Sequence, residues 1–187
     1  MDDLYLKNVR EGDINSFSFF IDKYKDIAYS IAIKIVKNEQ DAEEIVQDSF
    51  LKAYKAIHNY KRNAKFSTWL YKIVFNTAIS KARLKNLRTD SLKEHSYQQY
   101  NFVEINAAIQ NLTEQERKKY IKLALRNLDE IDYTILTLYY YEEKNIKDIG
   151  EIIKFKPSYI KFRLHRARGK LYFELKRILK EEVNEIL

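Results

Sequence analysis

Apolar residues recur three or four positions apart through most of the chain, which is the spacing of helices with one buried face. Such a repeat predicts a first helix from about Ile14 to Lys37. A second repeat follows Asn38, whose side chain can cap a helix with acidic residues in its first turn. Leu51 lies opposite the apolar stripe of this second helix, and an apolar residue on a polar face hints at contact with a partner. Its polar neighbours on that face are Glu44, Gln47 and Asp48.

The periodicity breaks between His58 and Lys65, where the residues are polar and basic, and we predict a loop there. Ser67 or Thr68 can cap a third helix. Its apolar stripe consists of Leu70, Ile73, Val74 and Ala78, and its other face carries Trp69, Lys72, Asn76, Ser80 and Arg83. Side chains of these types can stack on bases, hydrogen-bond to base edges and contact phosphates.

The C-terminal half contains the parts of a helix-turn-helix. Residues 87–112 are polar and weakly periodic, so we interpret them as a flexible linker. Thr113 and Glu116 form a capping-box pattern that restarts helical structure. A short amphipathic helix over 146–153, a turn that ends at Pro157 and a basic helix from Ser158 then complete the motif.

The basic helix is the expected recognition helix, because its N-terminal turns would enter the major groove of DNA. Arg and Lys side chains can read guanine edges there, and those further along can neutralise phosphates. His165 has no His or Cys neighbour, so a DNA contact or a plain surface position suits it better than metal ligation. The expected DNA contacts are Ser158, Tyr159, Lys161, Phe162, Arg163, His165, Arg166 and Arg168.

Composition limits the alternatives. The chain has 187 residues, of which 45% are apolar, and it contains three Gly, one Pro and no Cys. So few turn residues argue against a β-sandwich or barrel, and the lack of Cys excludes disulfides, Cys-ligated zinc and thiol catalysis. We therefore expect an all-α chain, and a cytoplasmic one because there is no signal-peptide pattern or apolar run of membrane-spanning length.

Charge is sorted along the chain. The formal net charge is +7, and it is unevenly distributed. Residues 38–51 contain five acids and no base, residues 61–88 contain eight bases and no acid, and residues 158–180 contain eight bases against one acid. Two separate basic segments predict two contacts with a polyanion such as DNA, and the acidic segment predicts a helix face turned toward something else.

Three motifs carry a resemblance to bacterial sigma-70-family factors. The run DAEEIVQDSFLKAY at 41–54 closely resembles the region 2.2 helix, and KFSTWLYKIVFNTA at 65–78 resembles the region 2.3–2.4 segment. The run LHRARGKL at 164–171 is similar to the end of the region 4.2 recognition helix. The small size resembles the extracytoplasmic-function (ECF) group, which lacks regions 1.1 and 3.

The resemblance implies two helical domains: a region 2-like domain over 1–86, the linker over 87–112 and a region 4-like helix-turn-helix domain over 113–187. It also implies binding to core RNA polymerase and to the −10 and −35 promoter elements, together with an anti-sigma factor as a partner. The implied polymerase-binding residues are Asp41, Glu44, Gln47, Asp48 and Leu51. The implied −10 contacts are Lys61, Arg62, Asn63, Lys65, Phe66, Ser67, Trp69, Lys72, Asn76 and Arg83, and the recognition helix from Ser158 would read the −35 element.

Two other classes of protein remain as alternatives. A stand-alone helix-turn-helix regulator would use the acidic helix as a dimer face, and its operator would be palindromic. A helical enzyme would need a nucleophile–base set, paired carboxylates, a phosphate-binding Gly loop or a metal cluster, and the sequence presents none. We therefore predict no enzymatic activity, no cofactor and no metal.

Overall fold

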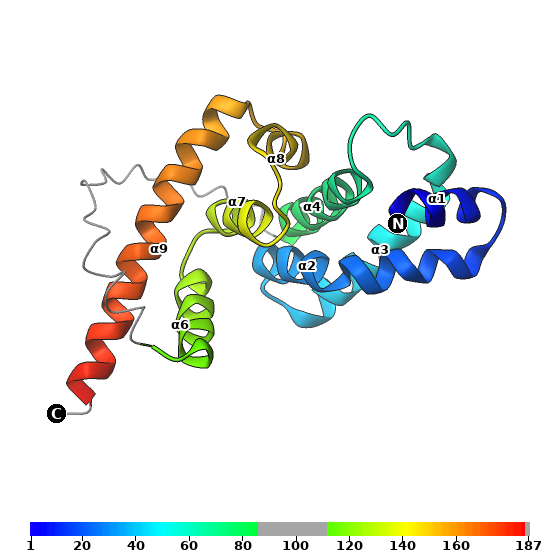
Figure 1. The fold of residues 1–187 in the computed structure, drawn as a ribbon. Helices are drawn as coiled ribbons and strands as arrows, with labels where there is room; N and C mark the ends of the chain where they lie inside the picture. Colours follow the sequence, from blue (N-terminus) through cyan, green and yellow to red (C-terminus); the bar gives the residue numbers. More distant parts are fainter. Residues whose placement is uncertain (86–111, 186–187) are drawn as a thin grey trace.

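The computed structural model describes residues 1–85 and 112–185, and within these ranges every regular element is helical (Figure 1). The all-α prediction is therefore confirmed for the described residues. Nearly all of the predicted linker over 87–112 lies outside them. No helix in the described ranges combines the length and the apolar character needed to cross a bilayer.

The N-terminal unit packs three long helices around one core. The core collects large side chains from all three, among them Phe20, Ile45 and Tyr71, whose exposed fractions are at most 1%. The unit consists of α1 (Asp2–Arg10), the 3-10 turn η1 (Ile14–Phe17), α2 (Ser18–Val36), α3 (Glu39–Lys55), the 3-10 turn η2 (Ile57–Asn59) and α4 (Phe66–Lys85).

Local capping explains where these helices begin and end. The Asn38 side chain accepts a hydrogen bond from the Asp41 amide at 2.9 Å, so the predicted cap of α3 is confirmed. Lys37 ends α2 in the left-handed conformation at φ 55°. The predicted cap of α4 at Ser67 or Thr68 is wrong, because α4 already begins at Phe66 and places both hydroxyl residues in its buried first turn.

The C-terminal unit contains the predicted helix-turn-helix. The capping box of Thr113 and Glu116 starts its first helix as expected. Lys154 ends α8 at φ 63°, and α9 begins at Pro157, a residue suited to the first helical position. The unit consists of α6 (Glu114–Arg126), α7 (Glu130–Tyr140), α8 (Ile146–Ile153) and α9 (Pro157–Glu185).

Gly150 allows α8 and its turn to pack closely. A Cβ atom at this position would lie 2.7 Å from the Phe155 carbonyl oxygen, which is closer than real Cβ atoms approach. The motif thus needs its glycine within the first helix and not in the turn.

The two units lie against each other and share an apolar core. Helix α8 runs beside α4, and α7 lies beside α2 (Figure 1). One buried cluster contains side chains of both units, for example Val74 of α4 and Ile149 of α8. Polar contacts also cross the boundary, since Lys34 Nζ donates to the Arg126 carbonyl at 2.6 Å. This packing of one unit on the other was not predicted from the sequence.

Candidate nucleic-acid and polymerase interfaces

The acidic face of α3 is only partly open to a partner. Gln47 and Asp48 are exposed, and half of the Leu51 surface is exposed as well. Asp41 and Glu44 are instead held by Lys81 of α4, whose Nζ lies 3.2 Å and 2.5 Å from their carboxylate oxygens. The structure therefore brings the five predicted residues onto one helix face and pairs two of them with Lys81; of these two, Asp41 is 13% exposed while Glu44 remains 63% exposed.

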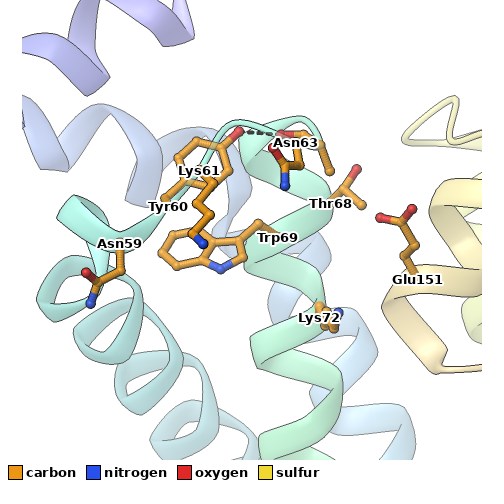
Figure 2. A pocket seen from close by; sticks show the side chains of 9 residues that line it. Asn59, Tyr60, Lys61, Asn63, Thr68, Trp69, Lys72 and Glu151 are labelled. Carbon is orange, nitrogen blue, oxygen red and sulfur yellow. Dashed lines mark hydrogen bonds between the residues drawn. The ribbon is translucent and has the colours of Figure 1, made fainter.

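The loop between α3 and α4 closes over a small pocket of about 260 Å³ (Figure 2). The Tyr60 ring stacks on the Trp69 indole with centroids 5.0 Å apart and an interplanar angle of 25°. Lys61 and Lys72 add positive charge to the wall. The full lining is Asn59, Tyr60, Lys61, Asn63, Ala64, Thr68, Trp69, Lys72 and Glu151.

The pocket loop is held in place by partly buried hydrogen bonds. Burial raises the pKa of Tyr60, and its protonated hydroxyl donates to the Ala64 carbonyl across the loop. Arg10 of α1 reaches the same region, where its Nε and Nη2 donate to the Ile57 carbonyl at 3.2 and 3.1 Å. A loop fixed in this way offers a pre-formed cavity, which reduces the ordering cost of binding.

Four of the ten predicted −10 contacts line this pocket: Lys61, Asn63, Trp69 and Lys72. Lys65 and Arg83 are exposed elsewhere, and Arg62 forms an ion pair with Asp3 at 3.6 Å. The half-buried Asn76 side chain donates to the Lys72 carbonyl at 2.6 Å within its own helix. The sequence missed the pocket residues Asn59, Tyr60, Ala64, Thr68 and Glu151.

Phe66 and Ser67 are corrections to the predicted set, because both side chains are buried in the core. Phe66 is 2% exposed, and its ring lies 4.3 Å from that of Phe20. Ser67 is 5% exposed and accepts a hydrogen bond from Lys144. Position 67 continues the apolar stripe of Leu70 at helical spacing, so the periodicity already contained this signal.

The recognition helix α9 presents an exposed face in its first turns. Ser158, Lys161, Phe162 and His165 are all exposed. The Arg166 guanidinium lies 5.4 Å from the centre of the Phe162 ring, within cation–π range. At the turn, Tyr159 stacks on Phe155 with centroids 4.6 Å apart. Arg168 donates to the Tyr140 hydroxyl at 2.8 Å and so lies at the side of this surface.

Arg163 is wrong as an outward-facing DNA contact. Its side chain is 6% exposed, and its Nη2 lies 2.8 Å from Asp129 and 2.7 Å from the fully buried Asp132. Lys170 Nζ joins the same two carboxylates, at 2.7 Å from Asp129. Arg163 shares the buried stripe of Ile160, because residues three apart lie on one helix face. Its role is therefore to attach α9 to α7.

The four charges of this cluster are strongly coupled. Burial opposes ionisation of Asp129, but hydrogen bonding with Asp132 and Lys170 outweighs it and lowers the pKa of Asp129 to about 2. Burial and the neighbouring Asp129 raise the pKa of Asp132. Two cations facing two carboxylates make the cluster self-contained, so it offers no charge to DNA.

The arrangement suits nucleic-acid binding better than catalysis. A stacked aromatic pair, amides and two lysines around a small cavity can hold an unstacked base and its backbone. The exposed N-terminal turns of a helix-turn-helix suit a DNA groove. Within the described ranges, no three His, Cys, Asp or Glu side chains are grouped so as to hold a metal ion.

The amino-acid sequence is similar to two sigma-70 family models and to known sigma factors. Residues 20–88 match the family Sigma-70 region 2, and residues 124–172 match Sigma-70, region 4. The chain is 31% identical over 180 residues to the ECF RNA polymerase sigma factor SigW of Bacillus subtilis (strain 168), covering 91% of this chain and 95% of that protein. It is 26% identical to the RNA polymerase sigma-H factor of Pseudomonas aeruginosa, with 96% of each chain covered.

Two solved structures share the fold. The sigma factor RpoE of Bartonella quintana, in complex with the anti-sigma factor NepR, matches with a TM-score of 0.62 and 22% identity over 87% of this chain and 98% of that chain. CnrH, in complex with the cytosolic domain of CnrY, matches with a TM-score of 0.61 and 17% identity over 93% of this chain and 96% of that chain.

Proposed function

Because this chain belongs to the sigma-70 family, within its extracytoplasmic-function group, and such factors direct transcription initiation, we propose that three of its surfaces each bind a different partner. The pocket beside Trp69 captures an unstacked base of the −10 element. The exposed part of the α3 acidic face binds core RNA polymerase. The first turns of α9 read the −35 element. The chain acts in the cytoplasm, where the polymerase works, and it is a binding protein without catalytic activity of its own.

The main support for this proposal is the pocket beside Trp69. Strand opening exposes bases that must be held apart from their partners, and stacking on an aromatic side chain contributes about 1–3 kcal/mol per base. Trp69 with Tyr60 provides such a platform, and the two lysines of the lining attract the backbone. The cavity beside this platform has a volume of about 260 Å³.

Run-off transcription with core polymerase over a promoter library tests the function directly. The expected result is initiation at a defined set of sites whose −10 and −35 sequences can then be read. Lys61→Ala, in the pocket, should weaken binding to a forked promoter with an exposed −10 strand more than binding to the closed duplex. Lys118→Ala on the exposed side of α6 is the matched control. Equal losses on fork and duplex would contradict base capture.

The polymerase surface is tested at Leu51, which is half-exposed. Leu51→Ala should weaken co-elution with core polymerase and leave the helical circular-dichroism signal unchanged. Ile21→Ala is the control, because Ile21 is also an exposed apolar residue, 39% exposed, but lies on α2. Unchanged binding by Leu51→Ala, or equal loss in both variants, would contradict the assignment.

We also infer an anti-sigma factor as a partner of this chain. The two solved structures described above were determined as complexes, and one partner is named as an anti-sigma factor. Affinity capture with this chain from the native host should recover a single regulatory protein besides the polymerase. Recovery of polymerase subunits alone would contradict this inference.

A further inference from the structure

Helix α1 is firmly attached to the N-terminal unit, although it lies before the segment that matches Sigma-70 region 2. Its residues Leu6 and Val9 are buried in the core. Near its first turn, Asp2 accepts hydrogen bonds from Lys23 and Tyr24 of α2, each at 2.6 Å. Helix α1 therefore has a fixed position from which its side chains can hold a neighbouring segment.

The loop of the base pocket has little backbone support of its own. Residues 61–64 make no backbone–backbone hydrogen bond to any other residue that the structure describes. Arg62 adopts the left-handed conformation at φ 57°, which residues other than glycine rarely adopt. The backbone alone therefore does not fix the shape of this loop, and side chains have to do so.

Arg10 of α1 supplies such support from outside the loop, beside which α1 lies (Figure 1). Its Nε and Nη2 donate to the Ile57 carbonyl at 3.2 and 3.1 Å, and Nη2 also donates to the Tyr60 carbonyl. Its guanidinium carbon lies 6.0 Å from the centre of the Tyr60 ring, within cation–π range. Tyr60 in turn stacks on Trp69 and donates to Ala64 at the far end of the loop. Arg10 is thus connected, through Tyr60, to the aromatic wall of the pocket.

We propose that α1 is a functional part of the −10 site, in which Arg10 is a positioning residue that fixes the loop from Tyr60 to Ala64 in the conformation that captures a base. This inference rests on the proposed function, because it concerns the same pocket. Arg10 is not among the residues that line the pocket, so it acts through the loop. Binding through the pocket scales with the fraction of molecules whose loop is correctly shaped, and discrimination between bases falls with that fraction.

The inference is tested with Arg10→Met, which removes the donors and keeps most of the apolar stem. Lys7→Met removes one positive charge from the exposed side of the same helix and is the matched control. The holoenzyme, formed with core polymerase, is bound to forked promoters that differ only in the exposed −10 base. The ratio of the affinities for the preferred base and for the others measures discrimination.

We expect Arg10→Met to lower this ratio at least about fivefold, the usual effect of one lost hydrogen bond, and Lys7→Met to leave it unchanged. The same ratio in Arg10→Met and in the wild type would overturn the proposal. A purely structural role would reduce the folded fraction and weaken binding to the fork and to a −35 duplex alike. Because that loss leaves the base ratio unchanged, it too would overturn the proposal.

Salt dependence separates positioning from a direct contact of Arg10 with phosphate. A lost phosphate contact reduces the slope of log affinity against log salt concentration by about one. We expect the slope of Arg10→Met to equal that of Lys7→Met. A slope reduced by about one relative to this control would show that Arg10 touches the DNA itself, and would overturn the positioning role.

A measurement without DNA tests the support of the loop by itself. Trp69 is the only tryptophan of the chain, and Tyr60 stacks on its indole. Quenching of its fluorescence by acrylamide should therefore increase in Arg10→Met and not in Lys7→Met, and equal quenching would overturn the support by Arg10.

A conservative variant provides the rescue. Arg10→Lys keeps the charge and can donate to one carbonyl, so it should recover part of the base ratio, and it takes the place of Arg10→Met if that variant does not fold. No recovery by a folded Arg10→Lys, with a ratio as low as that of Arg10→Met, would overturn the role of the donors. A wild-type holoenzyme without any base preference would instead overturn the proposed base capture, while the quenching comparison still decides whether Arg10 holds the loop.

Discussion

Replacing Arg163 with methionine should destabilise the C-terminal unit although it removes no exposed contact. Methionine keeps most of the apolar stem but leaves two carboxylates with Lys170 as their remaining cation. Removing one partner of a buried ion pair costs about 3–5 kcal/mol. Asp132 is completely buried, whereas Asp129 keeps some solvent, so we expect the lower end of this range, about 3 kcal/mol.

Stability is measured by urea unfolding monitored by circular dichroism. The urea concentrations at the unfolding midpoints are compared at a common slope of unfolding free energy against urea concentration. Lys161→Met on the exposed side of α9 is the control and should change stability by less than about 0.5 kcal/mol. Adding Asp132→Asn to Arg163→Met removes the uncompensated charge and should restore about 1–2 kcal/mol. The reasoning is refuted if Arg163→Met unfolds like the control, or if the double variant loses the sum of both single effects.

Three further outcomes are expected. Gly150→Ala should lower stability by at least about 1 kcal/mol in urea unfolding despite alanine's better helix propensity, since its Cβ would meet the Phe155 carbonyl; increased stability would contradict this. Phe162, exposed on α9, should contact a thymine methyl. Deoxyuridine in the −35 element should then weaken binding by the wild type but not by Phe162→Ala, and equal weakening in both would disprove the contact. Glu142 lies in the loop between α7 and α8 beside Tyr71 of α4, and its pKa, raised by burial, means that the contact between the two units is most stable at low pH and weakens as pH rises through that pKa. Acrylamide quenching of Trp69 should therefore increase as the pH rises through the pKa of Glu142 in the wild type and stay constant in Glu142→Gln.

Much of the local structure could be predicted because its causes are local. The Asn38 cap, the capping box at Thr113 and the start of α9 at Pro157 depend on a few neighbouring residues. The buried stripes follow from helical spacing alone. Of the three mistaken site residues Phe66, Ser67 and Arg163, the last two came from giving residue type more weight than position, since both continue buried stripes of their helices.

The pocket residues differ in whether the sequence alone could place them at the site. Trp69 and Lys72 share an exposed helix face, so their spacing alone placed them together. Tyr60 lay in a segment without periodicity, and only the hydrogen bond to Ala64 and the stack on Trp69 bring it into the wall. Nothing in the sequence near Glu151 indicates that it reaches this pocket from another helix.

The sequence by itself determined the helices, their caps, the segregation of charge and the family, because periodicity, capping and motif spacing act over a few turns of one chain segment. Only the tertiary structure decided which charged residues point inward and what covers the base pocket. Arg163 finds its carboxylates 34 and 31 positions away on α7, and Lys144 finds Ser67 77 positions away on α4. Such pairings depend on how separate helices pack, and the spacing of residues within one helix carries no information about its neighbours.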